Sequence, residues 1–150
     1  MKGFRQMKGV WSILVVLVFA LSAYAPIVKA TEPKSAADFV KEAKEKIKEV
    51  TVAEAKAKID SGAPLVILDV REPNEFKRGH VPKAINIPRG LLEFQVTKKI
   101  PDKNAYIIVY CAVGGRGALA AYALVQMGYK NVVNMDGGWK AWVKAGYPVE

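Results

Sequence analysis

Two short runs of continuous apolar residues constrain the fold of this chain more than any other feature. They are PLVILDV at residues 64–70 and AYIIVYC at residues 105–111, and neither alternates polar with apolar side chains. A strand with this composition is buried on both faces, as in a parallel sheet that has helices on either side. The two runs therefore predict central strands of a parallel sheet.

Further strand and helix patterns alternate around these two runs. AINIP at residues 84–88 and NVVNM at residues 131–135 indicate strands, and helical patterns cover residues 52–60, 90–100, 118–128 and 137–146. Such alternation with short connections is typical of a right-handed, doubly wound α/β fold. We expect a five-stranded, mostly parallel sheet with helices on both faces and a ligand site beyond the carboxyl ends of the strands.

An additional helix is predicted before this domain. Ser35 and Asp38 have the spacing of a capping box, and apolar residues recur at intervals of three and four up to Val50. We therefore assign an amphipathic helix to residues 31–50 and the α/β domain to residues 51–150. The helix is expected to lie on the edge of the domain, with a membrane-surface or partner-binding helix as the alternative.

Residues 1–30 have the layout of a secretory signal. Three cations come early, no charged residue occurs from Val10 to Val28, and small residues follow. We expect cleavage after Ala30 and export to the bacterial periplasm. The alternative is an uncleaved anchor in the inner membrane that holds the domain on the periplasmic side. The net charge is +9, and part of it comes from basic residues in this leader. The remaining basic residues are interleaved with acidic ones, so nucleic-acid binding is not indicated.

The only cysteine stands where a strand meets a glycine-rich turn. Cys111 cannot form a disulfide within the chain, so it is either an inert buried thiol or a reactive one. A helix start after the turn would offer backbone donors and partial positive charge, which favour anions and a thiolate. Three glycines at 114, 115 and 117 would turn amides inward, and Arg116 adds a cation. The pattern predicts a thiolate facing an anion-sized cradle.

The length of this cradle distinguishes between two chemistries. Cysteine-dependent phosphatases place an arginine after five intervening residues, whereas here Arg116 follows Cys111 after four and Gly117 occupies the later position. A shorter loop suits a smaller group, such as the outer sulfur of a persulfide. The spacing therefore favours sulfur chemistry over phosphate chemistry.

The chain resembles the rhodanese family, and specifically its single-domain exported members. The resemblance covers about residues 50–150 and rests on LVILDVREPNEFKRGHVPKAINIP, YCAVGGRG, ALAAYALVQMGYKNVVNMDGGWKAW and AGYPV. It implies a sulfurtransferase in which Cys111 attacks the outer sulfur of a donor such as thiosulfate. The resulting persulfide would pass its sulfur to a nucleophilic acceptor such as cyanide or a thiol. No cofactor beyond this covalent persulfide, and no metal, is expected.

The resemblance also suggests which residues bind the substrate. The loop should supply the binding residues Ala112, Val113, Gly114, Gly115, Arg116 and Gly117. Ala112 and Val113 lack the cation or hydroxyl that thiosulfate-specific members often carry there, which makes a polysulfide the alternative donor. Gly117 stands where a serine is common in the family.

Two polar residues after the PLVIL strand are further candidates. Arg71 would add positive charge for an anionic donor, and Asp69 would orient an arginine or the loop amides, with a structural role as the alternative for each. Glu75 is expected to form an ion pair within its charged segment. His80, the only histidine, has a structural position by family resemblance.

A second function of a different class remains open. The protein could carry sulfur as a persulfide and deliver it to a partner enzyme with little turnover of its own. The apolar loop and the basic amphipathic helix favour this alternative. A redox or phosphatase-like protein is a third option, against which stand the missing second cysteine and the short loop.

Overall fold

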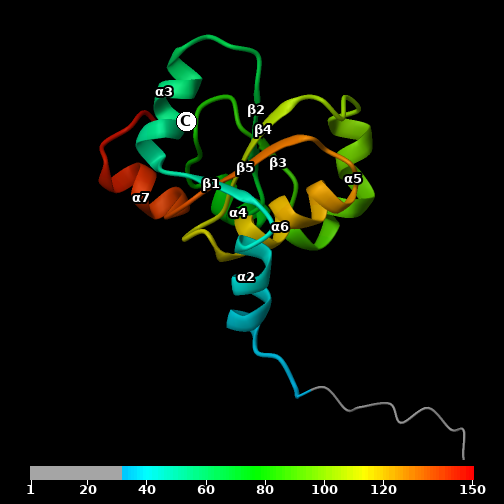
Figure 1. Cartoon of the computed structure of the whole chain (residues 1–150). Helices are drawn as coiled ribbons and strands as arrows, with labels where there is room; N and C mark the ends of the chain where they lie inside the picture. The colour runs from blue at the N-terminus through cyan, green and yellow to red at the C-terminus, as the bar shows by residue number, and fades with distance from the viewer. Residues whose placement is uncertain (1–31) are drawn as a thin grey trace, which may run out of the picture. The chain divides into compact units, whose positions relative to one another are not determined.

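Five strands form one sheet at the centre of the domain (Figure 1). They are β1 (Lys48–Val50), β2 (Val66–Asp69), β3 (Ile85–Asn86), β4 (Tyr106–Tyr110) and β5 (Asn131–Met135), in the spatial order β1-β5-β4-β2-β3. All four pairings between neighbouring strands are parallel. The predicted five-stranded α/β architecture is confirmed.

The computed structural model describes residues 32–150, of which Lys34–Glu150 form one compact unit. The predicted signal or anchor at residues 1–30, and its cleavage after Ala30, lie outside the described residues. Across residues 32–150, no helix combines the length and the apolar character needed to cross a membrane.

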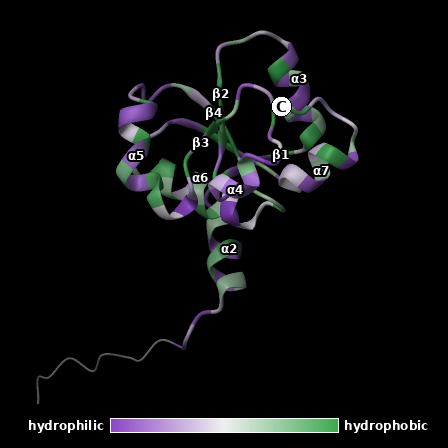
Figure 2. Ribbon diagram, turned by 180° about the vertical axis from the view of Figure 1, so that it is seen from behind, coloured by the Kyte–Doolittle hydropathy of each residue, from purple (hydrophilic) through white to green (hydrophobic). Residues whose placement is uncertain are grey.

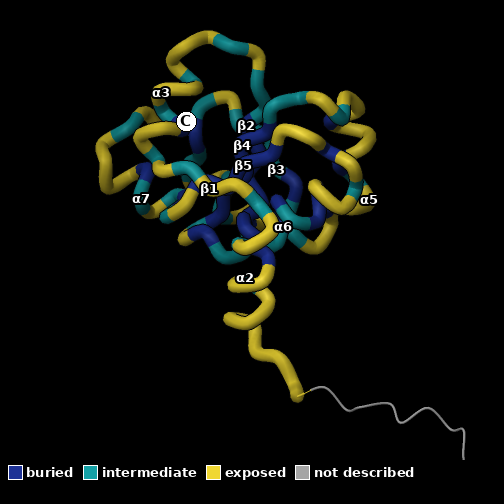
Figure 3. The backbone as a smooth tube through the Cα atoms, viewed as in Figure 1, coloured by how far each residue is buried: buried dark blue, intermediate teal, exposed yellow. Residues whose placement is uncertain are grey.

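The two central strands bury side chains on both faces, as their composition predicts. In β4, Ile107 and Val109 belong to one buried cluster, whereas Ile108 and Tyr110 belong to the other. Figure 2 shows these strands as hydrophobic, and Figure 3 shows them as buried. Each face of the sheet therefore has a hydrophobic core of its own.

Helices cover both cores. The first core includes side chains from α5 (Leu92–Lys99) and α6 (Gly115–Gln126), and the second includes side chains from α3 (Val52–Asp60) and α7 (Gly138–Lys144). Short helical turns, α4 (Pro73–Phe76) and η2 (Arg89–Leu91), follow β2 and β3. The connections after β2, β4 and β5 leave the sheet at its carboxyl edge, where a ligand site is expected.

The predicted helix over residues 31–50 is wrong in its extent. Helix α2 spans Ala36–Lys44 with the expected capping box of Ser35 and Asp38, but residues 48–50 form strand β1 and pair with β5. Without β1, the backbone groups on that side of β5 would have no partner within the sheet, and pairing satisfies them. Because β1 belongs to the sheet, the α/β domain begins before the predicted boundary at residue 51.

Candidate active site

Cys111 follows β4 directly and is buried, with 1% of its surface exposed. It is a free cysteine. Helix α6 begins at Gly115, earlier than the predicted start at Ala118, because Gly114 serves as its N-cap with a φ of 106°. This left-handed conformation is one that glycine adopts without strain. The turn between strand and helix is thus even shorter than the sequence indicated.

The turn directs a backbone amide at the cysteine sulfur. The Gly114 N–H donates a hydrogen bond to Cys111 Sγ, with 3.2 Å between nitrogen and sulfur. The Gly114 carbonyl points the other way and accepts the first hydrogen bond of α6, from Ala118 at 2.8 Å. Val113, in the middle of the turn, is 59% exposed. The sulfur therefore faces a backbone donor at a helix start, where negative charge on a bound group is stabilised.

The first residues of α7 donate backbone hydrogen bonds to the same turn. The Trp139 N–H donates to the Cys111 carbonyl at 2.8 Å, and the Lys140 N–H donates to the Ala112 carbonyl at 3.0 Å. Gly138 allows this approach, since a Cβ at its position would lie 2.3 Å from the Cys111 oxygen. The first three residues of α7 thus hold the backbone of the cysteine turn.

Arg116 lies in the first turn of α6 and forms a double hydrogen bond with Glu75 of α4. The two nitrogen–oxygen distances are 2.8 Å and 3.0 Å. The hydrogen bond from Arg116 lowers the pKa of the Glu75 carboxyl to about 2, and the pair with Glu75 raises the pKa of Arg116, to which the charge of Cys111 also contributes. Glu75 forms the ion pair predicted for it, but with a partner outside its own charged segment.

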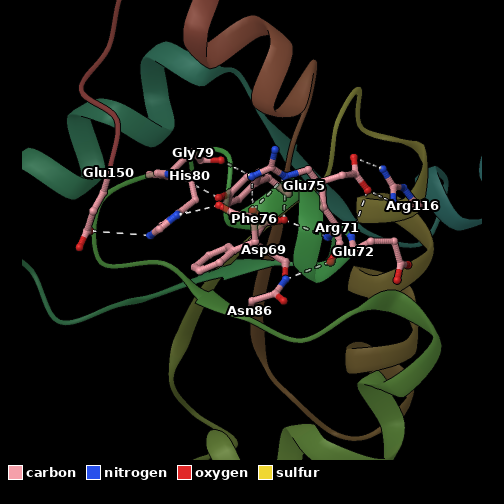
Figure 4. A network of polar contacts seen from close by, with 12 residues as sticks. Asp69, Arg71, Glu72, Glu75, Phe76, Gly79, His80, Asn86, Arg116 and Glu150 are labelled. Carbon is pink, nitrogen blue, oxygen red and sulfur yellow. Dashed lines mark hydrogen bonds and ion pairs between the residues drawn. The ribbon is translucent and has the colours of Figure 1, made fainter.

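Asp69 and Arg71 form a second ion pair, which is buried (Figure 4). Arg71 Nε lies 3.1 Å and 3.0 Å from the two Asp69 carboxylate oxygens, and another guanidinium nitrogen donates to the Gly79 carbonyl at 2.8 Å. The guanidinium also lies 4.6 Å from the centre of the Trp139 ring. Asp69 pairs with Arg71, and the roles of both residues in binding an anionic donor stay predictions.

His80 contacts the chain terminus and α4. Its ring stacks on Phe76 with 3.7 Å between ring centroids, and its backbone N–H donates to the Glu150 carbonyl at 2.8 Å. These contacts fit the structural position that the family resemblance implies.

A polar residue that the sequence analysis did not single out lies behind the cysteine turn. Asn134 of β5 is fully buried, and its Nδ2 lies 2.8 Å from Glu49 Oε1 and 3.4 Å from the Gly114 carbonyl oxygen. A Cβ at Gly117 would lie 2.3 Å from Asn134 Oδ1, which explains why glycine stands at 117. The available signal was a polar side chain inside an otherwise apolar strand, since buried polar groups need partners.

The site thus combines one buried thiol, one amide directed at its sulfur and one arginine held nearby. A thiolate in such surroundings is a nucleophile that can form a covalent intermediate. The surrounding donors can stabilise negative charge on the attacking and the modified sulfur.

Residues 51–145 match the model of the rhodanese-like domain. Thiosulfate sulfurtransferase 18 of Arabidopsis thaliana is 34% identical over an alignment that covers 70% of this chain and 85% of that protein. YrkF of Bacillus subtilis, named as a candidate sulfur carrier protein, is 35% identical across 64% of this chain. The alignment spans 51% of YrkF, about half its length.

Among solved structures, a protein of unknown function from Rhodopseudomonas palustris has a similar fold. It is described as a possible tyrosine phosphatase, and it matches with a TM-score of 0.75 and 35% identity over 81% of this chain and 98% of that chain.

Proposed function

The chain belongs to the rhodanese-like family, and on this basis we propose that it transfers a sulfane sulfur through a persulfide on Cys111. The single observation that carries the proposal is the position of Cys111 Sγ, at the start of α6 with the Gly114 N–H directed at it. Relatives named as sulfurtransferases support sulfur transfer as the general reaction.

In the first half-reaction the Cys111 thiolate attacks the outer sulfur of the donor. A sulfur–sulfur bond forms to Cys111 while the donor's own sulfur–sulfur bond breaks, and its electron pair leaves with sulfite if the donor is thiosulfate. In the second half-reaction a thiolate or cyanide attacks the outer sulfur of the persulfide. The bond to Cys111 then breaks and the Cys111 thiolate is regenerated.

The residues around the turn have separate roles in this scheme. The Gly114 amide stabilises the negative sulfur in both half-reactions, as preorganised donors do in other enzymes. Arg116, held by Glu75, supplies a cation close to Cys111. Ala112 and Val113 offer no charge or hydroxyl to a donor, so a polysulfide is a second candidate donor beside thiosulfate.

Cyanide-dependent formation of thiocyanate tests the proposal, with thiosulfate and a polysulfide compared as donors. The wild-type domain should turn over with at least one donor, and Cys111→Ser should lose that turnover while its unfolding curve stays close to wild type. Turnover that persists in Cys111→Ser would overturn the role of the cysteine. Absence of turnover with both donors would favour the carrier function described next.

A persulfide carrier is the second candidate, favoured by apolar surface near the thiol. Val113 is exposed in the cysteine turn, and α2 packs against α6, the helix that follows this turn. The methyl carbon Cγ2 of Val40 lies 3.6 Å from where a Cβ of Gly115 would be. A carrier would gain one sulfur atom by intact mass but would produce thiocyanate only when its partner enzyme is added.

Two further questions have direct measurements. Hydrolysis of an aryl phosphate by the wild type, lost in Cys111→Ser, would indicate phosphatase chemistry instead of sulfur transfer. For location, we propose export to the periplasm, with an uncleaved membrane anchor as the alternative. Intact mass of the protein from cell fractions distinguishes a chain that begins at Thr31 from one that retains residues 1–30.

A further inference from the structure

Asn134 links the cysteine turn to residues that lie before the matched family domain. Its side chain is fully buried, yet it belongs to a strand whose other inward residues are apolar. Its Nδ2 is directed at two acceptors, Glu49 Oε1 at 2.8 Å and the Gly114 carbonyl at 3.4 Å. Burying a side-chain amide costs free energy unless hydrogen bonds to neighbouring groups compensate for the lost contact with water.

Glu49 in turn is held by a helix residue. Lys44, the last residue of α2, lies 3.0 Å from Glu49 Oε1 and 3.0 Å from Asp136 Oδ1. The hydrogen bond with Glu49, followed by that with Asp136, raises the pKa of Lys44. Lys44 and Glu49 precede residue 51, where the match to the family domain begins. A connected set of side chains therefore runs from α2 through β1 and β5 to the cysteine turn.

The point of contact with the turn is the residue that faces the sulfur. Gly114 donates its N–H to Cys111 Sγ, and its carbonyl is the group that Asn134 approaches. The N–H and the carbonyl of Gly114 belong to neighbouring peptide planes joined at a glycine Cα, whose torsions are the least restricted, so a contact at the carbonyl also limits the direction of the N–H. Gly117 leaves room for Asn134 on the other side.

We infer that Asn134, anchored by Glu49, is a positioning residue that keeps the Gly114 N–H directed at Cys111 Sγ. This inference deepens the proposed function and rests on it for its relevance to sulfur transfer. Residues 44–50 are then part of the support of the active site and not a separate extension.

The test compares three variants of the full chain. Asn134→Leu has a similar volume and removes the amide without adding charge. Glu49→Met removes the anchor, and its side chain is 29% exposed, so it should fold even if Asn134→Leu does not. Asn131→Leu is the matched control, since Asn131 lies in the same strand but donates to the Asn104 carbonyl away from the site.

The main readout is the rate at which iodoacetamide alkylates Cys111 as a function of pH, which requires no sulfur transfer. In Asn134→Leu the pH profile should move upward by about one unit, the shift expected when a thiolate loses one hydrogen bond. Glu49→Met should shift it in the same direction, although loss of a negative charge alone would shift it downward. Asn131→Leu should overlay the wild type.

Two outcomes would contradict the inference. One is an Asn134→Leu variant that is less stable to urea but has the wild-type alkylation profile, which would indicate a purely structural role. The other is a downward shift in Glu49→Met. If wild type shows no sulfur transfer at all, the proposed function fails while the alkylation profiles still decide the role of Asn134.

Discussion

Arg116 and Glu75 are 41 residues apart in the sequence, yet their side chains form a double hydrogen bond beside the cysteine turn. The pair ties the first turn of α6, which follows the cysteine turn, to α4, and it holds the Arg116 guanidinium on the Glu75 carboxylate. The charged segment after β2 therefore takes part in building the candidate site, even though it contains no residue of the cysteine turn.

Replacement of this carboxylate should have an effect that depends on pH. The pKa of Glu75 is lowered from 4.5 to about 2 in the folded protein, so the pair stabilises the fold fully above pH 4.5 and loses this contribution as the pH falls toward 2. We expect Glu75→Gln to lower the free energy of unfolding by about 1 kcal/mol at pH 7. Urea unfolding at pH 7 and at pH 3 should show the difference from wild type shrinking at the lower pH.

Glu93→Gln provides the matched control for that experiment. It removes the exposed pair between Arg89 and Glu93 within one helical turn, where a smaller effect at pH 7 is expected. A difference in free energy of unfolding between wild type and Glu75→Gln that grows at low pH would contradict the role given to the pair of Arg116 and Glu75.

The buried pair of Asp69 and Arg71 should matter more for stability than the pair of Arg116 and Glu75. Asp69→Asn would leave the buried Arg71 without its counter-charge, and we expect a loss of about 3 kcal/mol or more in the free energy of unfolding. The double variant Asp69→Asn with Arg71→Met removes both charges and should recover much of this loss.

The double variant also tests the predicted contact of Arg71 with an anionic donor. If that contact exists, the KM for thiosulfate should rise in the refolded double variant while the rate with a polysulfide changes less. If the KM values of the double variant for thiosulfate and for the polysulfide both equal those of wild type, Arg71 has a structural role only. An Asp69→Asn variant as stable as wild type would contradict the prediction that a buried Arg71 without its counter-charge destabilises the fold.

Gly138 should be required for sulfur transfer because it touches the cysteine backbone. Gly138 and Gly146 both have positive φ, 55° and 71°, but a Cβ at Gly138 would lie 2.3 Å from the Cys111 oxygen and one at Gly146 would meet nothing within 4 Å. Alanine at either position should cost roughly 1–2 kcal/mol from its backbone conformation. Gly138→Ala alone should also slow persulfide formation on Cys111, by about tenfold or more.

Rapid-quench mass spectrometry of Cys111, together with thermal unfolding, measures both effects in the two alanine variants. Equal rates of persulfide formation in Gly138→Ala and Gly146→Ala would show that the close approach of α7 does not control the cysteine turn.

Lys83 offers a stabilising substitution away from the site. Its φ of 63° is the one left-handed value among the non-glycine residues that the structure describes. Its backbone N–H donates to Glu150 Oε2 at 2.9 Å, a bond that glycine would keep. We expect Lys83→Gly to raise the free energy of unfolding by about 0.5–1 kcal/mol, because glycine removes a strain of roughly 1–2 kcal/mol.

Lys77→Gly is the counterpart of that substitution in an ordinary conformation. Lys77 is the C-cap of α4 and has a φ of −61°, so glycine there should lower the stability by about 0.5–1 kcal/mol. Melting temperatures of the two variants that move in the same direction would contradict the assignment of strain to Lys83.

The elements that the sequence predicted correctly are those whose signal lies within a few residues. Ser35 with Asp38, and Thr51 with Glu54, form the capping boxes that their spacing indicates. Strands β2 and β4 are buried on both faces because their residues are apolar throughout. Strand β1 was missed, since Lys48 and Glu49 are exposed and their extended conformation comes from pairing with β5.

Local patterns in the sequence were enough to predict the class of fold and to single out Cys111 as the candidate nucleophile. Continuous apolar runs require a sheet covered on both faces, and a lone cysteine before a glycine turn can be recognised without coordinates. Which groups surround that cysteine follows only from the packing of the whole domain. Glu75, Asn134 and the α7 backbone reach the site from three separate segments, and their contacts depend on how strands far apart in the chain are ordered in the sheet. Local patterns encode no such long-range order, because each segment would have the same propensity in any arrangement of the strands.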